Sequence, residues 1–114
     1  MSISVLNSDF SKNRVFQQSH IKSCLHSVKH TLHALKEEYN DGLTAKQIED
    51  ALKEGFELIE DYPDDPRGHS SLLLTWVDVT PMHVVCAPHE SDLIIITLYI
   101  PSGNEWNDNF KQRK

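Results

Sequence analysis

A seven-residue turn, Tyr62-Pro63-Asp64-Asp65-Pro66-Arg67-Gly68, separates a helical first half of this chain from a second half rich in strand-forming residues. Two prolines and a glycine in such a short stretch are typical of a turn. Residues 56–62 before it, and residues 71–78, 82–87 and 93–100 after it, are rich in β-branched and aromatic side chains. The pattern predicts four strands, and the short links between the last three favour antiparallel hairpins.

The first half predicts two helices. In residues 20–39 the apolar positions follow i, i+3, i+4 and i+7 spacing, which places them on one side of a single amphipathic helix. Asn40-Asp41-Gly42 should end it, because these residues tolerate a left-handed conformation. A second helix should begin at Thr44, whose side chain can cap it while Gln47 returns the hydrogen bond, and Gly55 should stop it.

These elements predict an α+β fold. Two N-terminal helices should pack on a four-stranded, mainly antiparallel sheet, and a short C-terminal helix should form around Trp106 and Phe110. A chain of 114 residues is long enough for one modest core. We expect residues 1–19 to be an N-terminal arm and residues 20–114 to be a single domain.

Cysteine content and hydropathy predict a cytoplasmic protein. Cys24 and Cys86 form no Cys-x-x-Cys pair, which favours reduced thiols over a disulfide framework. Nowhere does an apolar stretch reach the ~18 residues that a membrane span needs, and the first six residues are too few for a signal sequence.

The charge is distributed unevenly. The net charge of the chain is −6, but the segment from Glu37 to Asp65 has eleven acidic and two basic residues, so it carries −9 and the remainder carries +3. A bipolar molecule of this kind can meet RNA on one side and a basic protein on the other. The plain alternative is a solvated acidic helix face.

Several segments match one family in order. They are His33-Ala34-Leu35-Lys36, Gly42-Leu43-Thr44, Ile59-Glu60-Asp61-Tyr62-Pro63, His83-Val84-Val85, Ile96-Thr97-Leu98-Tyr99 and residues 106–114. Over residues 29–114 they resemble a small bacterial family catalogued only as a domain of unknown function, whose members look like RelE-type and MqsR-type toxins. The resemblance implies a RelE-like fold and a toxin that cleaves messenger or other single-stranded RNA, free or on the ribosome. It also implies a cognate antitoxin, for which zinc-finger and helix-turn-helix proteins are the expected kinds.

A ribonuclease without metal needs a base, an acid and cations that steady the phosphate. His83 and His33 are the candidates for proton transfer, because an imidazole pKa near ~6.5 suits neutral pH. Arg67 could grip a phosphate by two hydrogen bonds. Tyr62 and Tyr99 could stack on a base or donate a proton.

Each of these roles has a structural alternative. His83 could be a half-buried strand residue with a satisfied ring, and Arg67 could be a turn residue paired with Asp64 or Asp65. The tyrosines could be aromatic residues at the edge of the core. Three cations near the end of the chain are the candidates for holding the RNA backbone, unless that segment is merely solvated: Lys111, Arg113 and Lys114.

Two further functions are open. On the predicted first helix, His26, His30, His33 and Glu37 share one face, and a histidine pair with one neighbour could bind zinc or nickel. Because ~1.5 Å per residue separates them along the axis, one ion could not bind all four. The ribonuclease hypothesis requires no cofactor.

The other function is a non-catalytic module that binds a basic protein through its acidic helices. The resemblance supports it in one respect, because Glu37 and Asp41 stand where the family usually has basic residues. Across these hypotheses the expected partners are an antitoxin, RNA, a basic protein or a second copy of the chain, and no membrane.

Overall fold

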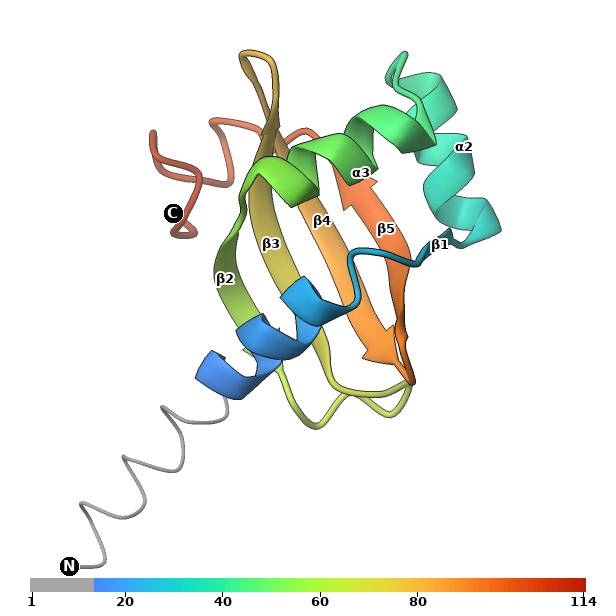
Figure 1. Ribbon diagram of the computed structural model, residues 1–114. Coiled ribbons are helices and arrows are strands. Elements are labelled where there is room, and N and C mark those ends of the chain that lie inside the picture. The colour runs from blue at the N-terminus through green and yellow to red at the C-terminus, as the bar shows by residue number, and fades with distance from the viewer. Residues whose placement is uncertain (1–13) are drawn as a thin grey trace, which may run out of the picture.

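The computed structural model describes residues 14–114, which fold into three helices and a five-stranded sheet (Figure 1). The helix nearest the N-terminus covers residues 14–23 of the described chain. The other elements are β1 (Val28–His30), α2 (Leu32–Asn40), α3 (Ala45–Glu54), β2 (Glu57–Tyr62), β3 (Ser70–Val77), β4 (Thr80–His89) and β5 (Asp92–Tyr99). The strand order is β1-β5-β4-β3-β2. The α+β class is therefore confirmed.

Strands β2 to β5 form the predicted antiparallel meander, with bounds within two residues of those expected. The β3–β4 and β4–β5 hairpins turn over two residues each, and Asp78 and Glu90 adopt left-handed φ angles of 55° and 57° there. Such angles match the turn to the twist of the flanking strands.

The prediction of one helix over residues 20–39 is wrong. That segment holds the end of the N-terminal helix, the short strand β1 and helix α2. Strand β1 adds to the sheet in parallel with β5, pairing Val28 with Leu93, and is the fifth strand that the sequence did not predict. Thr31 then starts α2, because its hydroxyl accepts a hydrogen bond from Ala34 N and donates one to Ile96 O.

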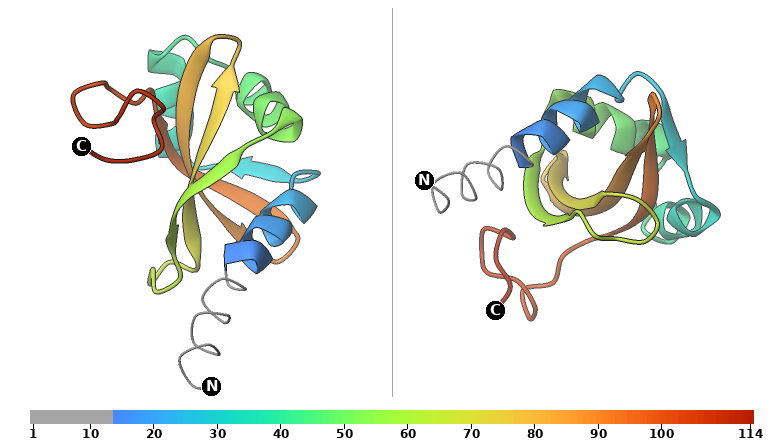
Figure 2. Two further views of the ribbon diagram at one scale, coloured as in Figure 1. Left: turned by 90° about the vertical axis from the view of Figure 1, so that its left-hand side faces the viewer. Right: turned by 90° about the horizontal axis from the view of Figure 1, so that it is seen from below.

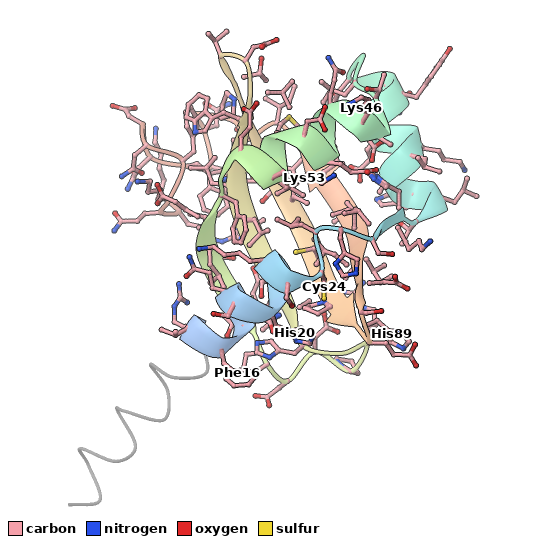
Figure 3. The ribbon with its side chains drawn as sticks, viewed as in Figure 1. Phe16, His20, Cys24, Lys46, Lys53 and His89 are labelled. Carbon is pink, nitrogen blue, oxygen red and sulfur yellow. The ribbon has the colours of Figure 1, made fainter. Side chains whose placement is uncertain are left out.

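The break changes which side chains are buried. Ile21 is fully buried on the N-terminal helix, whereas Leu32, Leu35 and Tyr39 of α2 are exposed although the single-helix wheel placed them on the core side. A helical wheel is valid only within one continuous helix. Phe16 and His20 also lie on the N-terminal helix (Figure 3), and Phe16 points into solvent.

The second predicted helix is confirmed as α3. Thr44 accepts a hydrogen bond from Gln47 N, and the Gln47 side chain accepts one from Thr44 N, which completes the capping box. Ile48 and Leu52 are buried against the sheet. Gly42 follows α2 with a φ of 71°, as expected of a residue that ends a helix.

The predicted C-terminal helix is absent from the described residues. The segment of residues 101–114 forms an irregular loop in which Trp106 and Arg113 make an isolated antiparallel bridge. Lys114 N donates to Glu105 O, and Asn107 N donates to Gln112 O. Phe110 has a φ of 61°, which is incompatible with a right-handed helix.

The two faces of the sheet are covered differently (Figure 2). The N-terminal helix and α3 cover one face, α2 packs beside β5 and β1 at the edge of the sheet, and the C-terminal segment lies on the other face. Within residues 14–114, none of the helices is both long and apolar enough to cross a membrane.

Candidate functional site

Three of the polar residues that the sequence singled out, Tyr62, His83 and Tyr99, lie on the sheet face opposite the N-terminal helix and α3. Tyr99 of β5 pairs with His83 of β4, which in turn pairs with Leu74 of β3. Glu60 and Tyr62 lie two residues apart on β2, so their side chains share a face. The C-terminal segment brings Arg113 to the same face.

The centre of the site is a cluster of three side chains, Glu60, Tyr62 and Arg113, which we call the Glu60 cluster. Arg113 donates two hydrogen bonds to the Glu60 carboxylate, from Nε at 2.8 Å and from Nη2 at 3.1 Å. The Tyr62 hydroxyl donates to the same carboxylate. All three side chains remain partly open to solvent.

The contacts within the Glu60 cluster set its protonation. The hydrogen bonds from Arg113 hold the pKa of Glu60 below its usual range, although partial burial opposes the shift. Burial and the hydrogen bond to Glu60 raise the pKa of Tyr62 to about 12. The hydrogen bonds to Glu60 raise the pKa of Arg113 as well. At neutral pH the cluster therefore presents a carboxylate, a protonated phenol and a guanidinium.

Behind this cluster, His83 is fully buried. Its Nε2 lies 2.7 Å from the carbonyl oxygen of Phe110, and its Nδ1 lies 3.1 Å from the hydroxyl of Tyr99. A carbonyl only accepts, so Nε2 carries the proton and the neutral ring accepts from Tyr99 at Nδ1. Burial lowers the pKa of His83, although the Phe110 hydrogen bond opposes this shift. Burial also disfavours the charged form of Tyr99, and it therefore raises the pKa of that hydroxyl.

Aromatic rings enclose the imidazole. The Trp106 ring meets His83 edge-on at 4.3 Å between centroids, and Tyr99 does so at 5.2 Å. The guanidinium carbon of Arg113 lies 4.6 Å from the centroid of Trp106. Among the described residues, no hydrogen-bond acceptor faces the buried Nε1 of Trp106. The loop that carries Arg113 is thus fastened over His83.

Arg67 is not part of this site. Its Nε and Nη2 bind the Asp65 carboxylate at 3.2 and 3.0 Å, so the guanidinium is held within the turn. Besides Arg113, the sequence predicted that Lys111 and Lys114 hold the RNA backbone. Lys111 forms an ion pair of 3.0 Å with Glu57, and Lys114 is exposed.

His33 lies at the opposite border of the same face. Its Nε2 is 3.2 Å from Glu37 Oε1, and that carboxylate also accepts hydrogen bonds from the Thr97 hydroxyl and Leu98 N. The His33–Glu37 pair therefore lies beside β5, and neither residue contacts the Glu60 cluster.

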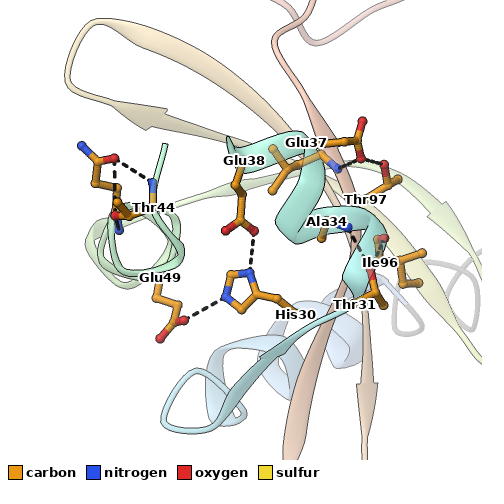
Figure 4. A network of polar contacts seen from close by, with 11 residues as sticks. His30, Thr31, Ala34, Glu37, Glu38, Thr44, Glu49, Ile96 and Thr97 are labelled. Atoms are coloured by element: carbon orange, nitrogen blue, oxygen red, sulfur yellow. Dashed lines mark hydrogen bonds and ion pairs between the residues drawn. The ribbon is translucent and has the colours of Figure 1, made fainter. Parts of the chain in front are cut away.

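The histidines considered for a metal site, His26, His30 and His33, do not share a face, because they lie on different elements. His26 is in a turn, where its Nδ1 is 2.8 Å from Ser23 O. His30 ends β1 and bridges two helices, with Nδ1 2.6 Å from Glu38 on α2 and Nε2 2.8 Å from Glu49 on α3 (Figure 4). Within residues 14–114, no three His, Cys, Asp or Glu side chains are grouped to hold a metal ion.

Comparison with protein families shows which family the chain belongs to. A family model described as Domain of unknown function (DUF4258) matches residues 30–100, from the end of β1 to just past β5. The chain belongs to this family. Neither the curated proteins nor the solved structures include a match. No named relative therefore links this DUF4258 protein to RelE-type or MqsR-type toxins.

Most of the site lies inside the DUF4258 match. Glu60, Tyr62, His83 and Tyr99 fall within residues 30–100, and Arg113 falls outside. Sequence reasoning did not select Glu60. The signal was available in the alternation of β2, because a carboxylate two residues before Tyr62 shares its face in any strand.

Most acidic side chains of the segment from Glu37 to Asp65 in this DUF4258 protein are paired, four of them with Lys or Arg and four with histidine. Eight of its eleven acidic residues contact a basic side chain. The contacts include Lys46 with Asp50 on α3 at 2.7 Å and His69 with Asp61 at 2.7 Å. The charge of −9 is consequently not a continuous free surface.

Proposed function

We propose that this DUF4258 protein is a metal-independent endoribonuclease that cleaves single-stranded RNA at the Glu60 cluster. One observation carries the proposal: a carboxylate, a protonated phenol and a guanidinium contact one another on a partly open sheet face. These are the base, acid and cation that such a reaction needs.

In the proposed reaction, Glu60 removes the proton of a ribose 2′-hydroxyl, and the 2′-oxygen attacks the adjacent phosphorus. The bond from phosphorus to the 5′-oxygen breaks, and Tyr62 gives its proton to that leaving oxygen. The products are a 2′,3′-cyclic phosphate and a free 5′-hydroxyl. Arg113 neutralises the charge that builds on the phosphate oxygens, because a guanidinium binds two of them at once.

His83 acts in this proposal as a positioning residue. It is fully buried and both ring nitrogens are bound by protein, so it does not reach RNA in this conformation. Its hydrogen bond to Phe110 O holds the loop that carries Arg113. Arg113 also lies over the Trp106 ring, with its guanidinium carbon 4.6 Å from the ring centroid, which helps to fix its position.

Arg113 also takes over the phosphate contact that the sequence assigned to Arg67. Lys114 is exposed and follows Arg113 directly, so it is placed to contact the next phosphate of a bound strand. Lys111 is paired with Glu57, and it contacts the RNA backbone when a phosphate displaces that carboxylate.

The test is cleavage of a mixed-sequence single-stranded RNA by the purified protein, with and without EDTA, followed by mapping of the new ends. We expect cleavage that survives EDTA and leaves 2′,3′-cyclic phosphates. Glu60→Gln should lower the rate by about a hundredfold or more, which is the usual contribution of a general base. Glu54→Gln, an exposed change on α3, is the matched control and should keep full activity.

Two results would overturn the proposal. One is the absence of any cleavage when ribosomes are also supplied. The other is cleavage that Glu60→Gln and Arg113→Gln leave unchanged while circular dichroism shows both variants folded.

The same proposal makes the protein the toxin half of a toxin–antitoxin pair, acting in the cytoplasm. Induction of the wild type should arrest growth, and induction of Glu60→Gln to the same protein level should not. Equal arrest by both would separate toxicity from RNA cleavage and remove the toxin assignment.

A further inference from the structure

A cavity of about 350 Å³ lies beside the turn that follows β2. Its walls are mainly apolar, with Ala87 and Pro88 contributed by β4, and Ile94 and Ile96 by β5. Arg67 and Gly68 of the 62–68 turn line one side, and His89, the last residue of β4 (labelled in Figure 3), also lines the cavity. A partly open, mainly apolar cavity with a few polar groups at its rim is typical of a site for a small organic group.

The sheet register places this cavity next to the Glu60 cluster. Tyr62 pairs with Ser70, the next step of the β3–β4 register sets Ser70 beside Ala87, and Ala87 pairs with Ile94. These four residues form one row across the sheet. Because neighbouring strands are ~4.8 Å apart, Tyr62 and Ala87 are separated by about 10 Å. One short stretch of RNA could occupy both places.

Arg67 stands at the rim of the cavity in a fixed position. The Asp65 carboxylate holds its Nε and Nη2, accepts from its backbone N at 2.9 Å, and accepts from the Ser70 hydroxyl at 2.7 Å. The remaining guanidinium nitrogen, Nη1, makes no hydrogen bond to any residue in the described range 14–114. Arg67 therefore brings a hydrogen-bond donor with no partner among those residues to the rim of the apolar cavity.

We propose that this cavity binds a nucleobase of the RNA strand whose phosphate occupies the Glu60 cluster. The proposal rests on the proposed ribonuclease function and deepens it. The apolar walls suit the faces of a planar ring, and Arg67 suits the acceptor atoms on its edge. The Arg67–Asp65 pair is neutral overall, which favours a neutral base over a second phosphate as the occupant.

Nuclear magnetic resonance of the isoleucine δ-methyl groups tests this site without any need for cleavage. The probes are the individual nucleoside monophosphates, with inorganic phosphate as the comparison. We expect the Ile94 and Ile96 methyl signals to shift with at least one nucleotide and not with phosphate. The Ile48 methyl, buried under α3, should not move.

Two variants sharpen the test. Ala87→Leu fills the cavity, and Arg67→Met removes the rim donor while changing only an exposed side chain. Each should weaken nucleotide binding by about tenfold, because each removes part of the stacking or edge contacts of one base. In cleavage assays both should raise KM more than they lower kcat, and should alter which base precedes or follows the cut.

The outcomes of the two proposals are distinguishable. RNA cleavage that depends on Glu60, together with Ile94 and Ile96 signals that no nucleotide shifts, would overturn the base site and keep the ribonuclease. Equal shifts with inorganic phosphate would also overturn it, because the cavity would then not recognise a base. Nucleotide binding without any cleavage would retain the cavity as a nucleotide site and remove the ribonuclease.

Discussion

The Nε2 of His83 donates its proton to the carbonyl oxygen of Phe110 over 2.7 Å, and this bond fastens the C-terminal segment to the middle of the sheet. Phe110 accepts it while holding a left-handed φ of 61°, an angle that is costly for a bulky residue. The loop around it is kept in place by this bond, by the Arg113–Glu60 contact and by the burial of Trp106.

We expect His83→Gln to lower the free energy of unfolding by about 1–3 kcal/mol at neutral pH, because it leaves buried hydrogen-bonding groups unpaired. The pH dependence is distinctive. Burial lowers the pKa of His83 in the folded state, so protons bind the unfolded chain preferentially. The stability is therefore fully present above the ordinary pKa of about 6.5 and is lost as the pH falls below it.

Urea unfolding of the wild type and His83→Gln at neutral and mildly acidic pH checks this prediction. The difference between the two proteins should shrink on acidification. A constant difference would show that His83 titrates alike in the folded and unfolded chains.

The Glu60–Arg113 contact predicts a second pH effect, at lower pH. Arg113 holds the pKa of Glu60 below its usual value of about 4.3, so the stabilisation is present above that pH and lost as the pH falls through the folded-state pKa. Its size should be about 1 kcal/mol or less, because both side chains are partly exposed.

A carbon-detected titration of the Glu60 carboxyl provides the measurement. In Arg113→Gln its pKa should rise towards the usual value, whereas Lys114→Gln, an exposed change one residue away, should leave it unchanged. An identical Glu60 titration in the wild type and Arg113→Gln would contradict the contact.

The bridge from His30 to Glu38 and Glu49 joins α2 to α3, and its loss should be costly (Figure 4). Glu38 is only 2% exposed, so His30→Ala leaves a buried carboxylate without its partner. We expect a loss of about 3 kcal/mol in the free energy of unfolding. His33→Ala, on the exposed face of α2, should change it by less than about 0.5 kcal/mol.

Chemical denaturation of both variants measures these two changes in the free energy of unfolding. Similar effects of His30→Ala and His33→Ala would mean that the His30 bridge adds no stability.

The β4–β5 turn offers a stabilising change. Glu90 has a left-handed φ of 57°, so Glu90→Gly should raise the free energy of unfolding by about 1 kcal/mol, because glycine adopts this conformation without strain. Ser91→Gly, in the same turn but without a left-handed angle, should lower it. A lower melting temperature for Glu90→Gly than for the wild type would contradict the argument.

The meander and α3 could be predicted from sequence because their signals are local. Strand composition, short links and the Thr44 capping box each lie within a few neighbouring residues. The break in the first predicted helix could not be found in this way. Val28 belongs to a strand because Leu93 lies beside it, and nothing near Val28 in the sequence indicates that partner.

The candidate site likewise contains residues that the sequence could predict and residues that it could not. Tyr62, His83 and Tyr99 were selected by residue type, and the register of the strands brings them to one face. The choice of Arg113 over Arg67 depends on how an irregular loop packs, with Glu60 and Arg113 separated by 53 residues. A tightly local pair such as Arg67 with Asp65 is the easier one to anticipate.

The parallel pairing of β1 with β5 has a consequence for how the chain is made. The two segments are joined across about 65 residues, as in the hydrogen bond from the Thr31 hydroxyl to Ile96 O, and loop closure on that scale is slow. During synthesis β1 and α2 leave the ribosome long before β5 exists. They cannot complete the sheet until the rest of the meander has emerged, so their core-facing residues stay exposed for most of the synthesis of the chain.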